Sequence, residues 1–415
     1  MTTAERQRKA QELIRPQLPP ELSRRDGRCP FDPAAALTEL SGQGRVHRFE
    51  QADGDVVWLV TGHEEARAVL AEPRMSADRM NSPRARRVIS PELHAEMFPP
   101  ERRAGSFIFM DAPEHTRIRK MLTGQFTVRR MRDLTPRVHE IVTSHLDAMV
   151  EKGPPADLVR DFALPVPSLV ICELLGVDYG DRDEFQERTA KLLSLDATID
   201  EQIKNATGLR VFMHSLVRSK QAAQGDDLLS GLVRDTDLST DELVGVANLL
   251  LIAGHETTAN MLALGTFALL EHPGQFAKLR DEPELIDNAV EELLRYLSIV
   301  SMGVARHAKE DVEIGGVTIR AGETVVVSVP AVNRDPGQYE DPHALLVDRP
   351  RGHHVAFGHG IHQCLGQQLA RVEMTVGFTE LLRRLPSLRL AVPVDEVPLR
   401  TDMSIYGVHR LPVTW

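Results

Sequence analysis

One apolar segment, residues 243–270, limits what this chain can fold into more than any other feature. A helix-start pattern precedes it, with Ser239 followed three residues later by Glu242, and Pro273 supplies the stop. About 30 residues, at a rise of about 1.5 Å each, form a helix roughly 45 Å long, enough to cross a whole domain. Its centre, residues 253–260, reads AGHETTAN and is too polar for a lipid-facing span. The pattern therefore predicts a long buried helix with a polar centre.

Shorter patterns around this segment predict the fold class. Helical periodicity dominates residues 113–297, residues 55–60 read as a strand, and residues 312–329 read as short strands broken by glycines. Residues 333–366 are rich in Asn, Asp, Pro and Gly and predict irregular backbone, after which a helix runs to about residue 385. Mostly helix with a small β portion at both ends predicts an α+β chain rather than a regular βαβ alternation.

Composition sets further limits. The 415 residues contain no Ser/Gly linker, low-complexity tract or repeat, so we expect one domain over residues 1–415. A formal net charge of −11 argues against nucleic acid as the main partner. The cysteines Cys29, Cys172 and Cys364 are far apart and odd in number, which predicts no disulfide framework and suits a reducing cytosol. Residues 1–17 are polar without an apolar signal core, so we expect a cytoplasmic protein without a membrane anchor.

The most specific motif is the sequence FGHGIHQCLG at residues 357–366. Its three glycines let the backbone turn tightly and approach a flat ligand closely. Cys364 stands just before a predicted helix, where unpaired N–H groups and the positive end of the dipole favour the thiolate. A thiolate sulfur is the ligand that a haem iron needs when an O–O bond is to be broken. The motif therefore predicts that Cys364 is the axial ligand of a haem iron.

Three other interpretations of this cysteine fail on features of the sequence. Cys172, within the apolar run LVICELL, is typical of a buried hydrophobic cysteine, whereas Cys364 is surrounded by glycines. A zinc site requires a second ligand pair, which His362 and Cys364 lack. A dinucleotide loop requires a glycine at position 363, where Gln stands.

The polar centre of the long helix is the second motif. Glu256 beside Thr257 is costly inside an apolar helix unless the pair has a function. Thr257 can donate to the carbonyl of Ala253 one turn back, and we expect Gly254 to leave room for a small ligand. This arrangement suits proton delivery to bound dioxygen, and the alternative is a polar patch at a helix crossing. A zinc-protease motif is excluded because position 259 is Ala.

The third motif is Glu292 followed three residues later by Arg295, a spacing that lets the two side chains pair on one helix face. Glu64 and Arg67 have the same spacing, and we interpret them as a solvated surface pair. Glu292 and Arg295 differ from that surface pair in position, because they lie between the long helix and the cysteine loop. Arg349 is a possible third partner for them.

In this order and spacing, the motifs resemble those of the cytochrome P450 superfamily over essentially the whole chain, and most of all its soluble bacterial branch from actinomycetes. The resemblance implies the cytochrome P450 fold, a triangular helical domain whose long central helix lies over haem b (iron protoporphyrin IX). It implies that Cys364 is the metal ligand and that Glu256 and Thr257 are the catalytic proton-relay pair. It also implies that the Glu292, Arg295 and Arg349 triad locks the fold around the cysteine loop.

The resemblance also assigns residues to the haem. Cations are needed for the two propionates, and it assigns this task to His115, Arg119, Arg306 and His362. The other expected haem contacts are Ala253, Gly254, Phe357, Gly358 and Gly366. The acid at position 256 is Glu where many relatives carry Asp, so details of proton delivery can differ.

The function implied is that of a monooxygenase which hydroxylates or epoxidises a sizeable apolar secondary metabolite or xenobiotic with O2. The chain contains no flavin, NAD or iron–sulfur motif, so electrons are expected from a ferredoxin and an NAD(P)H-dependent ferredoxin reductase, with the P450 chain a monomer. Two alternatives stay open. One is a peroxide-using, desaturating or coupling haem-thiolate enzyme, and the other is a non-catalytic haem-binding protein. The Glu256–Thr257 pair favours the use of O2.

Two surfaces complete the expectations. By analogy with the family, the substrate pocket is bordered by a loop at residues 74–109, helices near residues 192–203 and a strand at residues 299–304. Its expected lining residues are Leu249, Leu250, Ala253, Ile299, Val300 and Ile405. A cationic patch on the thiolate side is expected to dock an acidic ferredoxin, the alternative being ordinary solvated cations. The residues of this patch are Arg117, Lys120, Arg351 and Arg371.

Overall fold

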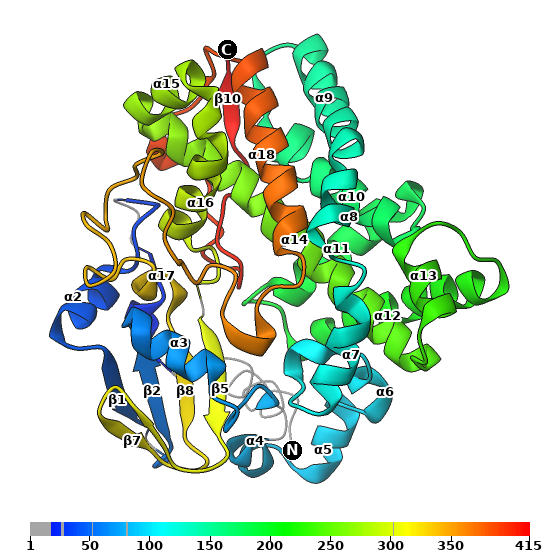
Figure 1. Cartoon of the computed structure of the whole chain (residues 1–415), viewed down its shortest axis with the longest axis vertical. Coiled ribbons are helices and arrows are strands. Elements are labelled where there is room, and N and C mark those ends of the chain that lie inside the picture. Colours follow the sequence, from blue (N-terminus) through cyan, green and yellow to red (C-terminus); the bar gives the residue numbers. More distant parts are fainter. Residues whose placement is uncertain (1–17, 26–28, 52, 80–81, 302) are drawn as a thin grey trace.

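The computed structural model describes residues 18–25, 29–51, 53–79, 82–301 and 303–415. Helices form the upper and right-hand parts of the molecule, and a small β-sheet lies at the lower left (Figure 1). The helix α14 (Thr240–Glu271) runs through the centre, partly behind α18 (Gln367–Arg384). This is the segregated arrangement of helix and sheet that the sequence predicts.

The bounds of α14 follow from its sequence. Ser239 caps the helix through its side chain, and Glu242 reaches back to the Ser239 backbone, so the predicted capping box is formed. At the other end, Pro273 begins the next helix directly after the last turn. Most of α14 is buried, with α10 and α12 along one side and α18 along another. The predicted long buried helix is therefore confirmed.

Other α-helices in the described part of the chain surround α14. They are α2 (Ala35–Gln43), α3 (His63–Ala71), α4 (Pro83–Val88), α5 (Pro91–Met97), α6 (Pro100–Arg103), α7 (Glu114–Thr123), α8 (Val128–Asp133), α9 (Thr135–Lys152), α10 (Pro165–Leu175), α11 (Arg182–Leu193), α12 (Ile199–Ala222), α13 (Leu228–Asp235), α15 (Pro273–Asp281), α16 (Ile286–Leu297) and α17 (Val329–Val332). The segment expected as a loop, residues 74–109, contains the short helices α4, α5 and α6, so the expectation of a loop is wrong at those helices. Residues 80–81 lie outside the described residues.

The main sheet has the order β1-β2-β8-β5-β3, and only β2 and β8 run parallel. Its strands are β1 (Val46–Glu50), β2 (Val56–Val60), β3 (Met75–Ser76), β5 (Val304–Ala308) and β8 (Thr324–Val327). Two smaller sheets hold β4 (Ala156–Asp157), β9 (Arg389–Leu390) and β10 (Pro412–Thr414), and β6 (Val312–Ile314) with β7 (Val317–Ile319). The strand expected at residues 299–304 begins only at Val304, and residue 302 lies outside the described residues.

The connection between α11 and α12 is hydrogen-bonded to a turn near the C-terminus. Ser194 forms a β-bridge with Met403, and Ser404 N donates to Leu193 O at 2.9 Å. Leu195 N donates to Asp402 O at 2.8 Å. The two helices are thus joined at residues 193–195 to the turn at residues 402–404.

The largest hydrophobic core lies among the helices around α14, and two smaller cores lie on the two faces of the main sheet. Among the described residues, no helix is both long and apolar enough to cross a membrane. The polar N-terminal stretch, residues 1–17, lies outside the described residues.

Candidate active site

The cysteine loop is a tight turn that precedes α18. Cys364 N donates to Phe357 O at 2.8 Å, which closes the loop on itself. Gly358 and Gly360 adopt positive φ angles of 72° and 71°. A Cβ atom at Gly360 would lie 2.5 Å from the backbone oxygen of Leu70, so this glycine also permits a close approach to α3. The motif therefore forms the compact turn that its glycines predict.

The protonation of Cys364 is set by opposing effects. Displacement of water by the surrounding protein raises the pKa of the thiol. Hydrogen bonds from the N–H groups of Gly366 and Gln367, at the start of α18, lower this pKa, and so does the charge of Arg119. The effect of burial is larger, so the pKa is raised overall. A thiol in such a place becomes a thiolate when a metal cation coordinates it, which suits an iron ligand.

Two histidines and two arginines from three elements gather beside this loop. His115 and Arg119 come from α7, Arg306 from β5 and His362 from the turn before Cys364. The rings of His115 and His362 lie 4.1 Å apart between centroids, and Arg119 Nη2 donates to the backbone oxygen of the neighbouring Gln363 at 2.5 Å. The structure thus brings together the residues expected to bind propionates.

No carboxylate forms an ion pair with this cluster among the described residues, although the charge of Asp111 raises the pKa values of His115, Arg306 and His362. Both ring nitrogens of His115 are buried without a hydrogen-bond partner, and Arg306, 7% exposed, donates only to the backbone of Ala305 among the described contacts. Burial and the charges of Arg306 and His115 lower the pKa of His362 to about 3, so this imidazole is neutral at pH 7 and can donate one N–H. A buried guanidinium and buried ring N–H groups are costly without acceptors. The two carboxylates of a haem would supply those acceptors, so the residues present fit this cofactor.

The expected haem-contact residues lie on α14 and in the cysteine loop. Ala253 is exposed at the centre of an otherwise buried helix, so α14 is uncovered there. Phe357 and Gly366 are partly exposed in the cysteine loop. A Cβ atom at Gly254 would lie 2.8 Å from Ile171 Cδ1 of α10, so this glycine lets two helices pack closely on that side. Gly254 is itself partly exposed beside Ala253, and its contact with a haem stays a prediction.

Glu256 and Thr257 are adjacent but have different partners. Thr257 Oγ1 donates to Ala253 O at 2.8 Å, as the sequence predicts. Glu256 is 4% exposed, and its Oε2 lies 3.0 Å from Nη1 of Arg400. Sequence reasoning missed Arg400, since no motif around this residue connects it with α14. The carboxylate is thus held by a side chain from the C-terminal region.

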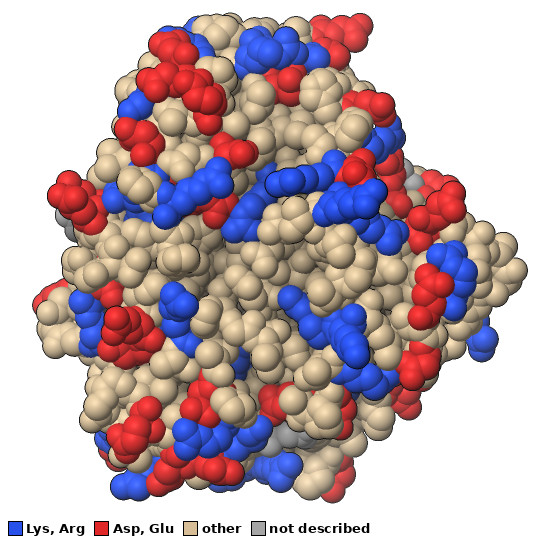
Figure 2. Space-filling view, viewed as in Figure 1, with Lys and Arg blue, Asp and Glu red and all other residues tan. Residues whose placement is uncertain are grey.

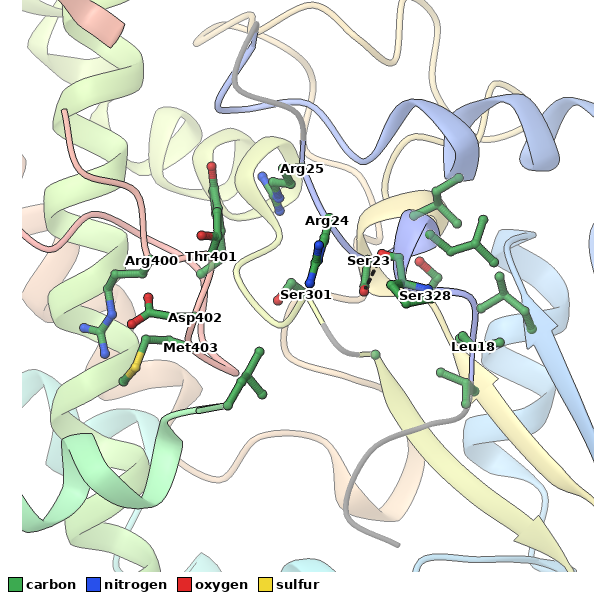
Figure 3. Close-up of a pocket in the computed structure, with 18 of the residues that line it drawn as sticks. Leu18, Ser23, Arg24, Arg25, Ser301, Ser328, Arg400, Thr401, Asp402 and Met403 are labelled. Carbon is green, nitrogen blue, oxygen red and sulfur yellow. Dashed lines mark hydrogen bonds between the residues drawn. The ribbon is translucent and has the colours of Figure 1, made fainter. Parts of the chain in front are cut away.

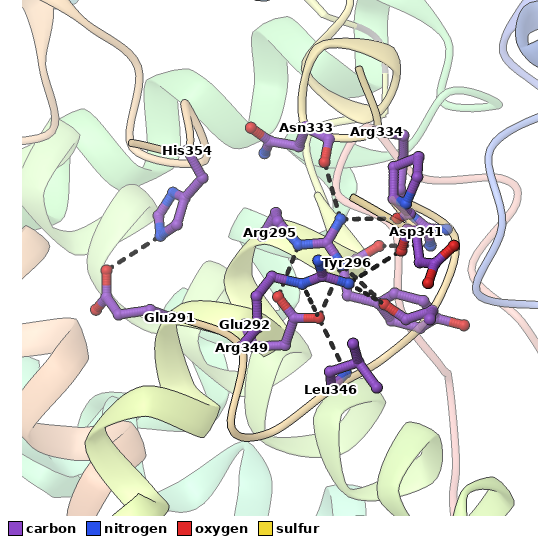
Figure 4. A network of polar contacts seen from close by, with 12 residues as sticks. Glu291, Glu292, Arg295, Tyr296, Asn333, Arg334, Asp341, Leu346, Arg349 and His354 are labelled. Atoms are coloured by element: carbon purple, nitrogen blue, oxygen red, sulfur yellow. Dashed lines mark hydrogen bonds and ion pairs between the residues drawn. The ribbon is translucent and has the colours of Figure 1, made fainter. Parts of the chain in front are cut away.

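The triad forms one buried network (Figure 4). Both carboxylate oxygens of Glu292 accept from Arg295, at 2.7 and 2.8 Å, and Arg349 Nε donates to Oε1 of the same carboxylate at 3.1 Å. Arg295 also donates to the backbone oxygens of Asn333, Pro342 and Ala344. The network joins α16 to the irregular segment that leads to the cysteine loop.

The residues expected in the substrate pocket differ in their surroundings. Val300 forms a β-bridge with Ile405, whereas Leu250 and Ile299 belong to the core. A pocket of about 490 Å³ lies next to this region. None of the six expected residues lines it, although Met403 does.

The expected docking residues are not equivalent. Arg117, with its side chain 41% exposed, pairs with Glu242 and Asp237 near the start of α14, so its charge is partly neutralised and its docking role stays a prediction. Lys120 is exposed and has no ion pair among the described residues. Arg351 lies only 3.7 Å from an exposed acid, Asp287. Side-chain exposure therefore favours Lys120 and Arg351.

A concave surface of about 560 Å³ lies near the cysteine loop and is lined by Arg132, Arg351, Arg371 and Gln363. Arg371 is partly engaged, because its Nε donates to Glu291 at 2.6 Å. Figure 2 shows Lys and Arg side chains in a band above the centre of this face and in a second group over α7. Arg132 of α8 was not predicted from the sequence.

Comparison with known proteins identifies the family. The family profile described as Cytochrome P450 matches residues 197–403. Cytochrome P450-SU2 of Streptomyces griseolus is 48% identical over 415 residues, covering 100% of both chains. The vitamin D3 dihydroxylase of the same organism is 45% identical, covering 93% of this chain and 95% of its own. The solved structure of Rif16 in complex with R-L has a TM-score of 0.84 at 55% identity, covering 96% of this chain and 100% of that chain.

These likenesses extend over nearly the full length of both chains and agree with the fold and with the motifs of α14 and the cysteine loop. They bear out the resemblance from which the expected fold and enzyme class were taken. The chain belongs to the cytochrome P450 family and is a haem-dependent monooxygenase.

Proposed function

We propose that Cys364 ligates the iron of haem b and that this monooxygenase hydroxylates or epoxidises a sizeable apolar secondary metabolite or xenobiotic. The observation that carries the assignment is the cluster of His115, Arg119, Arg306 and His362 beside Cys364, which forms no ion pair with a carboxylate among the described residues and leaves both ring nitrogens of His115 without a hydrogen-bond partner. An iron porphyrin would satisfy both parts of this site at once, with its metal at the sulfur and its carboxylates at the cations.

The haem, when bound, supplies the activation of dioxygen. The residues of the chain supply position and protons. Cys364 holds the cofactor on one side, and Ala253 and Thr257 lie at the uncovered centre of α14. Glu256 and Thr257 are the proton-relay pair, because an acid and a hydroxyl in a largely dry site can pass a proton inward.

The substrate assignment rests on the relatives. The vitamin D3 dihydroxylase, 45% identical to this chain, is named for a large apolar substrate. Hydroxylation of a compound of similar size and polarity is the activity that we propose for this chain.

Electrons are proposed to come from a ferredoxin reduced by an NAD(P)H-dependent reductase. Arg117, Lys120, Arg132, Arg351 and Arg371 carry the docking surface, with the charges of Arg117 and Arg371 partly neutralised by Glu242 and Glu291. We propose further that residues 1–415 form one cytoplasmic domain that works as a monomer. The relay pair favours O2 over the alternatives of a peroxide-using or coupling enzyme and of a haem-binding protein without activity.

The carbon monoxide spectrum of the reduced protein tests the central assignment. We expect the far-red-shifted Soret band that thiolate ligation produces, and we expect Cys364→Ser to abolish it. Cys172→Ser is the matched control, because Cys172 is fully buried in α10 and should leave the band unchanged. An unchanged band in Cys364→Ser would overturn the proposed function.

A further inference from the structure

The carboxylate of Glu256 has one ion pair among the described residues, and its partner is Arg400. The Nη1–Oε2 distance is 3.0 Å, and the two side chains are 11% and 5% exposed. Asn260, one turn further along α14, donates to the backbone oxygen of Glu256 at 2.7 Å and contacts Arg400 Nη1 through its Oδ1 at 3.4 Å. The acid of the relay pair is therefore held in a small buried cluster.

The backbone that carries Arg400 is fixed against α14. Arg400 N donates to Gly407 O at 2.9 Å, and Leu399 forms a β-bridge with Val408. A Cβ atom at Gly407 would lie 1.9 Å from Asn260 Oδ1, so only glycine permits this approach. The guanidinium is thus delivered to Glu256 by a tightly packed segment.

Arg400 also faces the pocket of about 490 Å³. Figure 3 shows Arg400, Asp402 and Met403 beside the long helix, across the pocket from Leu18. The pocket is in contact with solvent, because two of its lining residues, Arg24 and Thr401, are exposed. One side chain therefore touches both the buried acid and a solvent-accessible space.

We propose that Arg400, which lines the pocket and binds Glu256, is a positioning residue for proton delivery that fixes the buried carboxylate for protonation from the pocket side. The inference rests on the proposed role of Glu256. The ion-paired carboxylate of Glu256 accepts a proton from solvent in the pocket, passes it toward Thr257, and is then again a carboxylate paired with Arg400. Arg400 itself keeps its protons, as a guanidinium does at all relevant pH values.

A purely structural role is the alternative, in which Arg400 only fastens the C-terminal turn to α14. That role predicts lower stability and poorer haem loading in variants, with no specific effect on proton transfer. The solvent isotope effect on turnover and the yield of product per NAD(P)H separate the two roles, since a structural role does not change either quantity in the protein that remains folded.

The experiment compares Arg400→Ala and Arg400→Lys in the haem-loaded protein with its redox partners. We expect Arg400→Ala to form product about tenfold more slowly, with a larger solvent isotope effect, because general acid catalysis is weakened. Substrate binding, followed by the spin-state shift, should stay unchanged, and Arg400→Lys should recover most of the rate. Arg24→Ala is the matched control, since Arg24 lines the same pocket without a contact to Glu256 among those described.

A double-mutant cycle shows whether Arg400 acts through Glu256. In a Glu256→Gln background, Arg400→Ala should cause no further loss of rate. Additive losses, or a wild-type isotope effect in Arg400→Ala, would overturn the inference while leaving the proposed function intact. If Glu256→Gln itself turns over normally, the relay assignment fails as well. Should Arg400→Ala not load haem, Arg400→Gln carries the same test, because it keeps a hydrogen-bond donor without the charge.

Discussion

Replacing Glu292 by Gln should strongly destabilise the protein. The carboxylate accepts four hydrogen bonds, two from Arg295, one from Arg349 Nε at 3.1 Å and one from Leu346 N at 3.0 Å. The substitution preserves the shape of the side chain but removes its negative charge. It leaves Arg295 and Arg349, with side chains 2% and 10% exposed, without their shared counter-charge.

The magnitude follows from this burial. Breaking a buried ion pair by removing one partner costs about 3–5 kcal/mol. Each factor of ten in an equilibrium constant corresponds to about 1.36 kcal/mol, so the unfolding equilibrium should shift by roughly two to four orders of magnitude. Since whole domains are stable by only about 5–15 kcal/mol, the loss is a large share of the total.

The assay is urea unfolding of the haem-loaded protein, followed by far-ultraviolet circular dichroism. Glu64→Gln is the matched control, because Glu64 begins the same three-residue spacing toward Arg67 on α3 and is exposed. Exposed substitutions of this kind change stability by less than about 0.5 kcal/mol. Equal unfolding midpoints for Glu292→Gln and Glu64→Gln would refute the reasoning about the buried network.

Three further predictions concern protons, docking and pH. Thr257→Ala should still consume NAD(P)H and O2 but divert electrons to peroxide or water, and normal product yield per NAD(P)H would exclude the role of this hydroxyl. Arg351→Ala should slow reduction by ferredoxin at low ionic strength only, as stopped-flow kinetics can show, and equal rates at low salt would place docking elsewhere. Although burial alone would raise the pKa of Glu291, hydrogen bonds from His354 and Arg371 lower it to about 2. Wild type should therefore exceed Glu291→Gln in free energy of unfolding by a constant amount above about pH 4.5, and this excess should shrink toward pH 2. Acid-unfolding curves measure it, and an excess that does not change with pH would contradict the assignment.

Features that depend on neighbouring residues could be predicted from the sequence. The bounds of α14 follow from Ser239, Glu242 and Pro273, all within one turn of a helix end. The hydrogen bond from Thr257 to the carbonyl of Ala253 follows from helix geometry alone. These caps and hydrogen bonds form between residues within a few positions of one another, so they do not depend on tertiary packing.

Features that depend on distant packing could not be predicted. Arg400 reaches α14 from about 140 residues away along the chain, and no spacing rule connects the two. The sequence around Gly254 does not show that the side chain of Ile171 packs against this glycine. The pairing of Arg117 with Glu242 likewise required the angle between α7 and α14. Charge patterns identify cations, but only tertiary structure shows which of them are already neutralised.

The segment from Arg400 to Ser404 is attached to two parts of the molecule. Residues 402–404 bond to the connection between α11 and α12, and Arg400 bonds to Glu256. Five consecutive residues thus join the polar centre of α14 to the ends of α11 and α12. If a ligand that orders this connection strengthens the ion pair of Arg400 with Glu256, linkage requires that the ion pair strengthens the binding of that ligand by the same free energy.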